Sequence, residues 1–165
     1  MQSVAKLFAA ALVVGTFATP ASAITYQLTT TLDGAQAGTA STATGSGTLS
    51  YDDLSNLLSW NIGFSGLMGT ESVAHFHGPA APGVNAGIQI SLPLGSPKVG
   101  SATLSTLQET DLLANLWYIN IHSRIAPSGE IRGQLLVSAV PEPATYAMLL
   151  AGLGLVGFAT RRRTR

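Results

Sequence analysis

The sequence predicts an all-β fold, an antiparallel β-sandwich with one short helix, and an open β-barrel is the alternative. Two observations predict it. Between residues 24 and 139, short segments rich in alternating, β-branched and aromatic residues are separated by turn residues, which is typical of strands. Only one segment in this region has a helical pattern, and no tandem repeat or heptad run is present. Such a series of strands favours two packed antiparallel layers.

Seven segments are candidate strands, namely residues 25–32, 47–51, 57–64, 72–77, 87–92, 117–122 and 130–137. The polar residues 52–56 predict a hairpin loop between the second and third strands. Residues 35–46 are small and polar, which indicates a flexible loop or an irregular edge. The helix is expected over residues 105–116, with Thr110 as its cap and Asp111 in its first turn.

The strand at residues 117–122 shows how the two faces are assigned. Successive side chains of a strand point to opposite faces. Trp117, Ile119 and Ile121 are therefore expected in the core. The other face of this strand is partly polar, and the candidate chemistry lies there: Tyr118, Asn120 and His122.

The N-terminal residues 1–23 have the three parts of a secretion signal in the correct order. Lys6 gives a positive start, residues 7–18 form a short apolar run, and Pro20 precedes a small-x-small site at Ala21 and Ala23. A run of twelve residues is too short to cross a bilayer as a helix. We therefore expect a signal peptidase to cut after Ala23, so that the mature chain begins at Ile24.

The C-terminal residues 140–165 form a second targeting segment. Pro141, Glu142 and Pro143 precede an uncharged stretch at residues 144–160, which as a helix of about 25 Å is just long enough to cross a membrane. Arginines follow at positions 161, 162, 163 and 165. The positive-inside rule places these arginines in the cytoplasm and the preceding domain across the membrane.

This order of motif, apolar stretch and basic end resembles the PEP-CTERM sorting signal of Gram-negative bacteria that produce exopolysaccharide. The resemblance covers Val140 to Arg165 and rests on Pro141, Glu142, Pro143 and the cluster Arg161, Arg162 and Arg163. It implies that an exosortase, a membrane enzyme, cuts near the Pro-Glu-Pro and delivers the protein to the cell surface or the extracellular space. The alternative is an uncut membrane anchor.

The region between the two targeting segments is acidic and lacks cysteine. Residues 24–139 hold three basic and seven acidic residues, so their formal charge is −4 although the whole chain is neutral. Binding to nucleic acid depends on clustered lysines and arginines, so nucleic acid is not an expected partner. The absence of cysteine excludes disulfides, thiolate metal ligands and a cysteine nucleophile.

Two longer phrases in this region resemble the CHRD domain, first described in chordin. One is the His-x-His-Gly-Pro phrase that begins at His75, and the other runs from Tyr118 through Asn120 and His122 into Pro-x-Gly-Glu-Ile-Arg-Gly at residues 127–133. The resemblance covers Thr25 to Val137. It implies an exported β-sandwich module whose binding partner is not fixed by the family.

All three histidines of the chain lie in these two phrases. His75 and His77 are two residues apart on one predicted strand, so their rings share a face about 6.5 to 7 Å apart at the backbone, and His122 on a neighbouring strand can add a third ligand. Three imidazoles suit Cu or Zn. Copper-zinc superoxide dismutase, also a β-sandwich, uses a His-x-His strand for its copper, which is an analogy and not a match. The sandwich predicted from the series of strands is immunoglobulin-like or superoxide-dismutase-like. In the alternative interpretation the histidines bond to Asn120, Glu130 and backbone and lock two strands together.

The acidic and basic residues of the second phrase have two interpretations. Glu130 and Arg132 share a strand face, which predicts an ion pair between them or across the sheet. Alternatively Glu130 orients a histidine, as carboxylates do around metals. No nucleophile elbow or phosphate-binding loop is present. The sequence therefore favours a non-catalytic surface or matrix module that binds exopolysaccharide or surface proteins, with a metal-dependent dismutase as the alternative.

Overall fold

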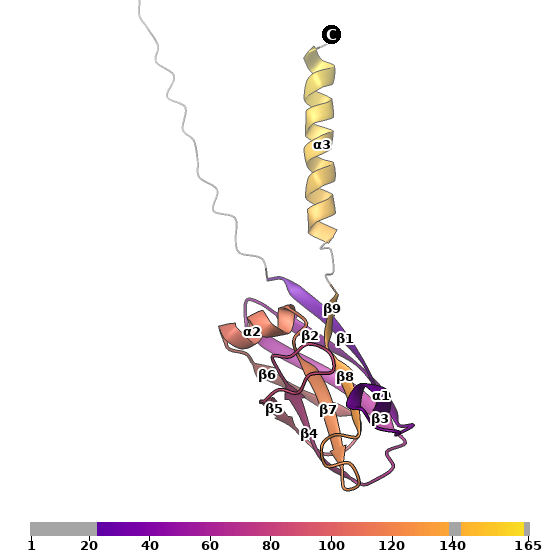
Figure 1. The fold of residues 1–165 in the computed structure, drawn as a ribbon. Helices are drawn as coiled ribbons and strands as arrows, with labels where there is room; N and C mark the ends of the chain where they lie inside the picture. The colour runs from indigo at the N-terminus through magenta and orange to yellow at the C-terminus, as the bar shows by residue number, and fades with distance from the viewer. Residues whose placement is uncertain (1–22, 139–142, 164–165) are drawn as a thin grey trace, which may run out of the picture.

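The structure, a computed structural model, describes residues 23–138 and 143–163 (Figure 1). Most of the predicted signal peptide, including Ala21, lies outside the described residues, and so do Pro141 and Glu142 of the sorting motif. The fold of the described chain is all-β with few helices, as the sequence predicts.

Nine strands and three helices follow in chain order. They are β1 (Thr25–Asp33), α1 (Gly34–Ala37), β2 (Thr44–Asp52), β3 (Leu57–Ser65), β4 (Glu71–His77), β5 (Ile88–Leu92), β6 (Lys98–Thr103), α2 (Thr106–Leu113), β7 (Tyr118–Ser123), β8 (Ile131–Gln134), β9 (Leu136–Ser138) and α3 (Pro143–Arg163). Each strand pairing is antiparallel.

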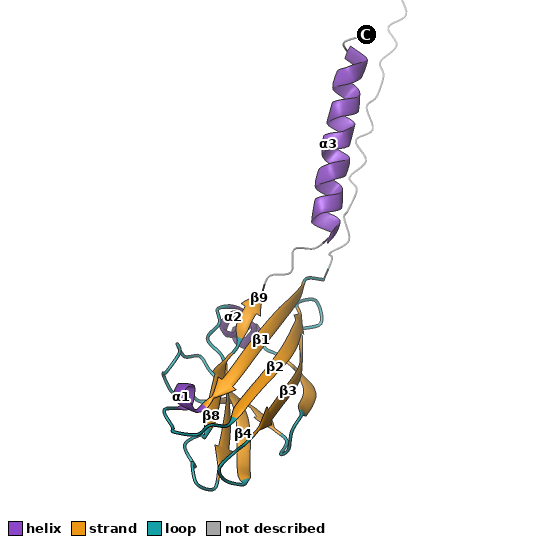
Figure 2. Ribbon diagram, turned by 90° about the vertical axis from the view of Figure 1, so that its right-hand side faces the viewer, coloured by secondary structure: helices purple, strands orange, loops and turns teal. Residues whose placement is uncertain are grey.

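The strands form one nearly closed sheet in the order β5-β4-β7-β8-β1-β2-β3-β6, with β9 paired to β1. This arrangement combines features of the predicted sandwich and of the open barrel. The sheet folds over itself, because Trp60 of β3 and Phe76 of β4 are far apart in strand order yet their ring centroids are 5.3 Å apart. Figure 2 shows β1, β2 and β3 side by side in one half of the folded sheet. The core therefore lies between the two halves of a single sheet.

The predicted core of β7 is confirmed. Ile119 and Ile121 are fully buried, as is Trp117 just before the strand, and all three belong to the main hydrophobic cluster. Across the core they face apolar residues of β1 and β2, such as Leu28 and Leu49. Burying side chains of this size stabilises the fold by about 1.5 to 3 kcal/mol each.

Several sequence expectations differ in detail. The loop expected at residues 35–46 contains most of α1 and the start of β2, and the expected strand at residues 130–137 is two strands, β8 and β9. Strand β6 was not predicted. The expected helix is confirmed as α2, but Ser105 caps it in a capping box with Gln108, while the Thr110 hydroxyl donates to the Thr106 carbonyl inside the helix.

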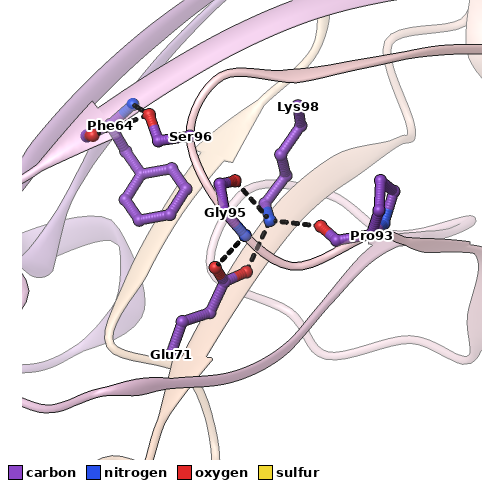
Figure 3. Close-up of polar contacts among 6 residues, drawn as sticks. All are labelled: Phe64, Glu71, Pro93, Gly95, Ser96 and Lys98. Atoms are coloured by element: carbon purple, nitrogen blue, oxygen red, sulfur yellow. Dashed lines mark hydrogen bonds and ion pairs between the residues drawn. The ribbon is translucent and has the colours of Figure 1, made fainter.

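A buried lysine holds the connection between β5 and β6 (Figure 3). Lys98 is fully buried, and its ammonium group contacts the Glu71 carboxylate and donates to the carbonyls of Pro93 at 2.7 Å and Gly95 at 3.2 Å. The Gly95 N–H donates to the second oxygen of Glu71. All three donors of the ammonium group are therefore paired.

A C-terminal helix, α3, runs from Pro143 to Arg163, over the segment at which the sequence predicts a helix, and it ends in Arg161, Arg162 and Arg163. The predicted crossing of a membrane is not supported. Within the described residues, no helix combines the length and the apolar character that a crossing requires.

Candidate metal centre

The three histidines lie on the outer face of β4 and β7. His75 and His77 project from β4 on the same side, and the antiparallel register places His75 opposite Asn120 and Val73 opposite His122. Because side chains alternate, the inward neighbours Phe76 and Ile121 fill the core while the histidines face outward. The bulge between Phe76 and His77 in the pairing with β5 marks this end of β4.

The structure brings the three rings together. Ring centroids lie 5.4 Å apart for His75 and His77, 5.4 Å for His75 and His122, and 6.1 Å for His77 and His122. One ring nitrogen from each histidine lies within 4.8 Å of the others. Two nitrogens bound to one ion at 2.0 to 2.1 Å can be at most about 4.2 Å apart, so binding an ion draws the rings slightly closer.

In two of the three histidines, His77 and His122, a backbone carbonyl determines which ring nitrogen is free. His77 Nδ1 lies 3.0 Å from the Ala86 carbonyl oxygen, and His122 Nδ1 lies 2.8 Å from that of Pro127. A carbonyl only accepts, so each Nδ1 carries the hydrogen and each Nε2 keeps a lone pair. This is the arrangement of metal-binding histidines, whose second nitrogen is usually bonded to a carbonyl or carboxylate.

The nitrogens that face one another have no protein partner. Among the residues that the structure describes, His75 Nδ1, His77 Nε2 and His122 Nε2 are buried atoms without a hydrogen bond. Buried polar groups are normally paired, so three unpaired ring nitrogens in one cluster call for an explanation. A bound cation supplies one, because it would be the common partner of all three nitrogens.

The electrostatics of the cluster favour neutral rings at His75 and His77. Burial lowers the pKa of His75, and the neighbouring His122 and His77 lower it further. Burial also lowers the pKa of His77, against the smaller opposing effect of its bond to Ala86. Neutral imidazole is the form that binds metals, so little proton release is needed for binding at neutral pH.

Tyr118 and Arg132 form a stack beside the His77 ring. The Tyr118 ring stacks on His77 at 5.0 Å with planes 7° apart, and the Arg132 guanidinium lies 3.3 Å from the Tyr118 ring centroid. Arg132 also donates to the Val84 carbonyl at 2.8 Å. The loop of residues 78–87, which carries the Ala86 carbonyl, is thus fixed against the sheet.

The structure does not bring Glu130 to the histidines. Its carboxylate accepts hydrogen bonds from the Ser41 hydroxyl at 2.8 Å and from the Met68 N–H at 2.6 Å. Within the described part of the chain, the recorded ion pair joins Lys98 and Glu71, not Glu130 and Arg132. Glu130 is therefore placed as an anchor for the loops around residues 41 and 68.

Asn120 was predicted beside both the histidines and Glu130, and its contacts give it a structural role. Its amide donates to the Ser128 carbonyl at 3.1 Å, and it packs against Gly129. The contributions that sequence reasoning missed come from the backbone carbonyls of Ala86 and Pro127. Nothing in the residue types of those positions signals them, because any residue offers a carbonyl.

The donor set fits a single Cu or Zn ion. Three imidazole nitrogens are a ligand set that both metals accept, and a tetrahedral ion would keep one position for water or a small ligand. His75 and His122 are only partly buried as side chains, although the ring nitrogens that would face the ion are themselves buried. The described cluster holds no carboxylate ligand.

Comparison with known protein families agrees with both resemblances found in the sequence, to the CHRD domain and to the PEP-CTERM sorting signal. The model of the CHRD domain matches residues 28–135, which is more than half of the chain, and the model of the PEP-CTERM protein-sorting motif matches residues 139–163. Neither a curated protein nor a solved structure matches the chain. The chain therefore belongs to the CHRD domain family and carries a PEP-CTERM motif, the signal of an exported protein that an exosortase sorts.

Proposed function

We propose that this protein is a non-catalytic module of the cell surface or extracellular matrix that binds one Cu or Zn ion through His75, His77 and His122. The observation that carries the proposal is the convergence of three buried, unpaired ring nitrogens within 4.8 Å. The carbonyls of Ala86 and Pro127 support it, because they leave the metal-facing nitrogens of His77 and His122 free to bind.

The proposal includes a route to the surface. A signal peptidase removes residues 1–23 after the Ala21-Ser22-Ala23 site, the domain at residues 24–139 folds outside the inner membrane of a Gram-negative cell, and the tail at residues 140–165 keeps the protein at the membrane until it is processed. Exosortase then cuts near Pro141, Glu142 and Pro143. The PEP-CTERM match supports this route.

Mass spectrometry of the surface form tests the route. Cutting near Pro141 removes about 25 of the 165 residues, in addition to the signal peptide. Replacing Pro141, Glu142 and Pro143 with alanine should leave the longer form in the membrane. A surface form that keeps Arg161 would show that the tail is a permanent anchor.

Titration with Cu²⁺ or Zn²⁺ tests the metal site. The purified chain should bind one equivalent of metal, and His75→Ala combined with His122→Ala should abolish tight binding, because one imidazole is left. The matched control is Thr29→Ala combined with Ser50→Ala, two changes on the other half of the sheet that should not alter binding. Absence of tight binding, or binding that survives the double histidine variant, would refute the metal site.

A dismutase-like activity is the second candidate function. It is favoured by one observation, a set of three histidine ligands, which would leave a bound copper with a coordination position for a small ligand. The same samples decide it. If the copper-loaded protein speeds superoxide decay and the double histidine variant does not, the module is an enzyme, whereas metal binding without such decay supports the non-catalytic function.

A further inference from the structure

The half of the sheet away from the histidines has an outer face made mostly of small polar side chains, with Leu57 and Val99 as its exposed apolar residues. It is formed by β1, β2, β3 and β6, and we call it the hydroxyl face. Nine side chains define it: Gln27, Thr29, Thr31, Ser46, Thr48, Ser50, Ser59, Asn61 and Ser101. Their neighbours along the strands, such as Leu28, Leu49 and Trp60, point into the core.

Strand register arranges these side chains in rows. One row runs through Thr29, Thr48, Asn61 and the exposed Val99, and the next through Gln27, Ser50, Ser59 and Ser101. Neighbouring strands are about 4.8 Å apart and alternate residues along a strand about 6.8 Å apart. The face is therefore a regular array of hydroxyl and amide groups.

The face is hollowed along its length. Three adjoining hollows of about 240, 520 and 400 Å³ follow β2 and its neighbours. The first two share Thr48 and Asn61, and the last two share Ser46 and Gly63. Gly63 adds depth, because it has no side chain beside Ser46. The hollows together make one shallow groove that an extended chain can follow.

The hydrogen-bonding groups of the face are available. Within residues 23–138 and 143–163, no hydrogen bond to protein is recorded for any of the nine side chains. Most of the nine are exposed, with Ser50 and Ser59 half-buried. Each hydroxyl both donates and accepts, as do the hydroxyls of a sugar.

The lack of charge among the nine side chains indicates which class of partner the hydroxyl face can bind. None of the nine side chains is charged, and the charges on the same outer face are those of Asp33 and Asp52, at the ends of β1 and β2. A nucleic acid or another anionic polymer would require lysines and arginines, which the face lacks. A protein partner would require aromatic or arginine anchors at its centre, which it also lacks. The match is a neutral, hydroxyl-rich polymer.

We propose that the hydroxyl face binds a neutral polysaccharide chain, which lies along the groove over β2 and bonds to Thr48, Asn61 and their neighbours. This site is separate from the metal centre, which lies on β4 and β7. Binding of the polysaccharide is therefore independent of metal, and its failure would not affect the metal proposal.

Native gel electrophoresis of the full chain in mild detergent tests this site. Gels containing dextran, pullulan or a mixed-linkage β-glucan provide neutral probes, and alginate provides an anionic one. At least one neutral polymer should slow the protein, with or without a chelator, and alginate should not. Thr48→Ala combined with Asn61→Ala should weaken retardation about tenfold or more, because two central hydrogen-bonding groups are lost.

The matched control is Thr70→Ala, which removes one exposed hydroxyl in the segment between β3 and β4, away from the face. It should migrate as the wild type does, and circular dichroism should show that all variants are folded. Three results would overturn the proposal: no retardation by any neutral polymer, retardation unchanged in the double variant, or stronger retardation by alginate. Self-association that Thr48→Glu abolishes, without retardation by neutral polymers, would assign the face to a second copy of the chain instead.

Discussion

Gly129 and Asn120 determine the local geometry beside the metal centre. Gly129 has a φ of +123°, and a Cβ built there would lie 2.2 Å from Asn120 Oδ1. Both a strained backbone and a steric clash therefore oppose any other residue at position 129. This explains the glycine of the Pro-x-Gly-Glu phrase by geometry alone.

Gly129→Ala should accordingly destabilise the protein by at least about 1 to 3 kcal/mol from backbone strain alone, with a further cost for displacing Asn120. Gly83→Ala is the matched control, because Gly83 also has a positive φ, +80°, but a Cβ there would meet nothing within 4 Å. Urea unfolding measures both. Equal losses for the two variants would show that the contact with Asn120 contributes nothing.

Glu130 should make the stability of the protein depend on acid pH. Burial alone would raise the pKa of Glu130, but hydrogen bonds from Ser123, Met68 and Ser41 outweigh it, so the pKa lies below its usual 4.5. The ionised form is therefore favoured by folding. Its contribution is fully present above the unfolded pKa and is lost as pH falls through the lower folded pKa.

Glu130→Gln should be less stable than the wild type at pH 7, yet it should lose less stability between about pH 5 and about pH 3. Ser41→Ala, which removes one of the donors, should have an intermediate slope. Urea unfolding at several pH values measures these slopes. A slope for Glu130→Gln as steep as that of the wild type would show that other carboxylates cause the acid sensitivity.

At the scale of elements, the loop of residues 78–87 connects Tyr118 of β7 and Arg132 of β8 to the metal centre. Its Ala86 N–H donates to the Tyr118 hydroxyl, its Ala86 carbonyl orients His77, and Arg132 holds its Val84 carbonyl. Arg132 thus acts on the site through the loop. The planar guanidinium suits this role, because its flat face stacks on the Tyr118 ring while an N–H at its edge donates a hydrogen bond to the Val84 carbonyl.

Arg132→Gln should loosen this loop without unfolding the sheet. Hydrogen exchange of Ala86 and its neighbours should become faster, while the amides of β7 should stay protected, because the core is untouched. Arg124→Gln is the control, since it removes the same charge from an exposed position. If exchange in the loop is equally slow in both variants, the loop is held by its other contacts.

The elements differ in how much of them could be predicted, and the reasons are physical. β7 alternates so clearly that its inward and outward residues follow from the sequence. β6 reads Lys-Val-Gly-Ser-Ala-Thr, with few β-branched residues, and it becomes a strand because β3 pairs with it along its whole length, from Ile62 opposite Lys98 to Leu57 opposite Thr103. The helix cap was misplaced because Thr110 and Ser105 are both good capping residues, and only Ser105 has Gln108 three residues later.

The metal centre could be predicted only in part, because local sequence spacing places two of its histidines and long-range pairing places the third. The i and i+2 spacing of His75 and His77 fixes a shared face from sequence alone. The position of His122 depends on the register that sets Asn120 opposite His75, and this is a long-range property that no local pattern specifies. The carbonyls that orient two of the rings belong to loops, whose paths follow from the whole fold.

At the scale of the whole molecule, one folded sheet has two outer faces with different chemistry. Its ends, β5 and β6, are joined by a short connection, and Lys98 and Glu71 fasten that connection to the start of β4. Because β6 pairs with β3 and β5 pairs with β4, this contact brings together the two ends of the sheet order. It is therefore expected to stabilise the nearly closed form of the sheet.

Lys98→Met should destabilise the protein by about 3 to 5 kcal/mol, because it leaves the Glu71 carboxylate without its cation and two carbonyls without a donor. Adding Glu71→Leu should recover part of the loss, since a buried pair replaced by apolar groups is often tolerated. Val99→Met, at the exposed neighbouring position of β6, is the control and should change stability by less than about 0.5 kcal/mol. Urea unfolding of the two single variants and the double variant gives the coupling energy. Losses that simply add would mean that the two side chains act separately and that the connection is held by its backbone alone.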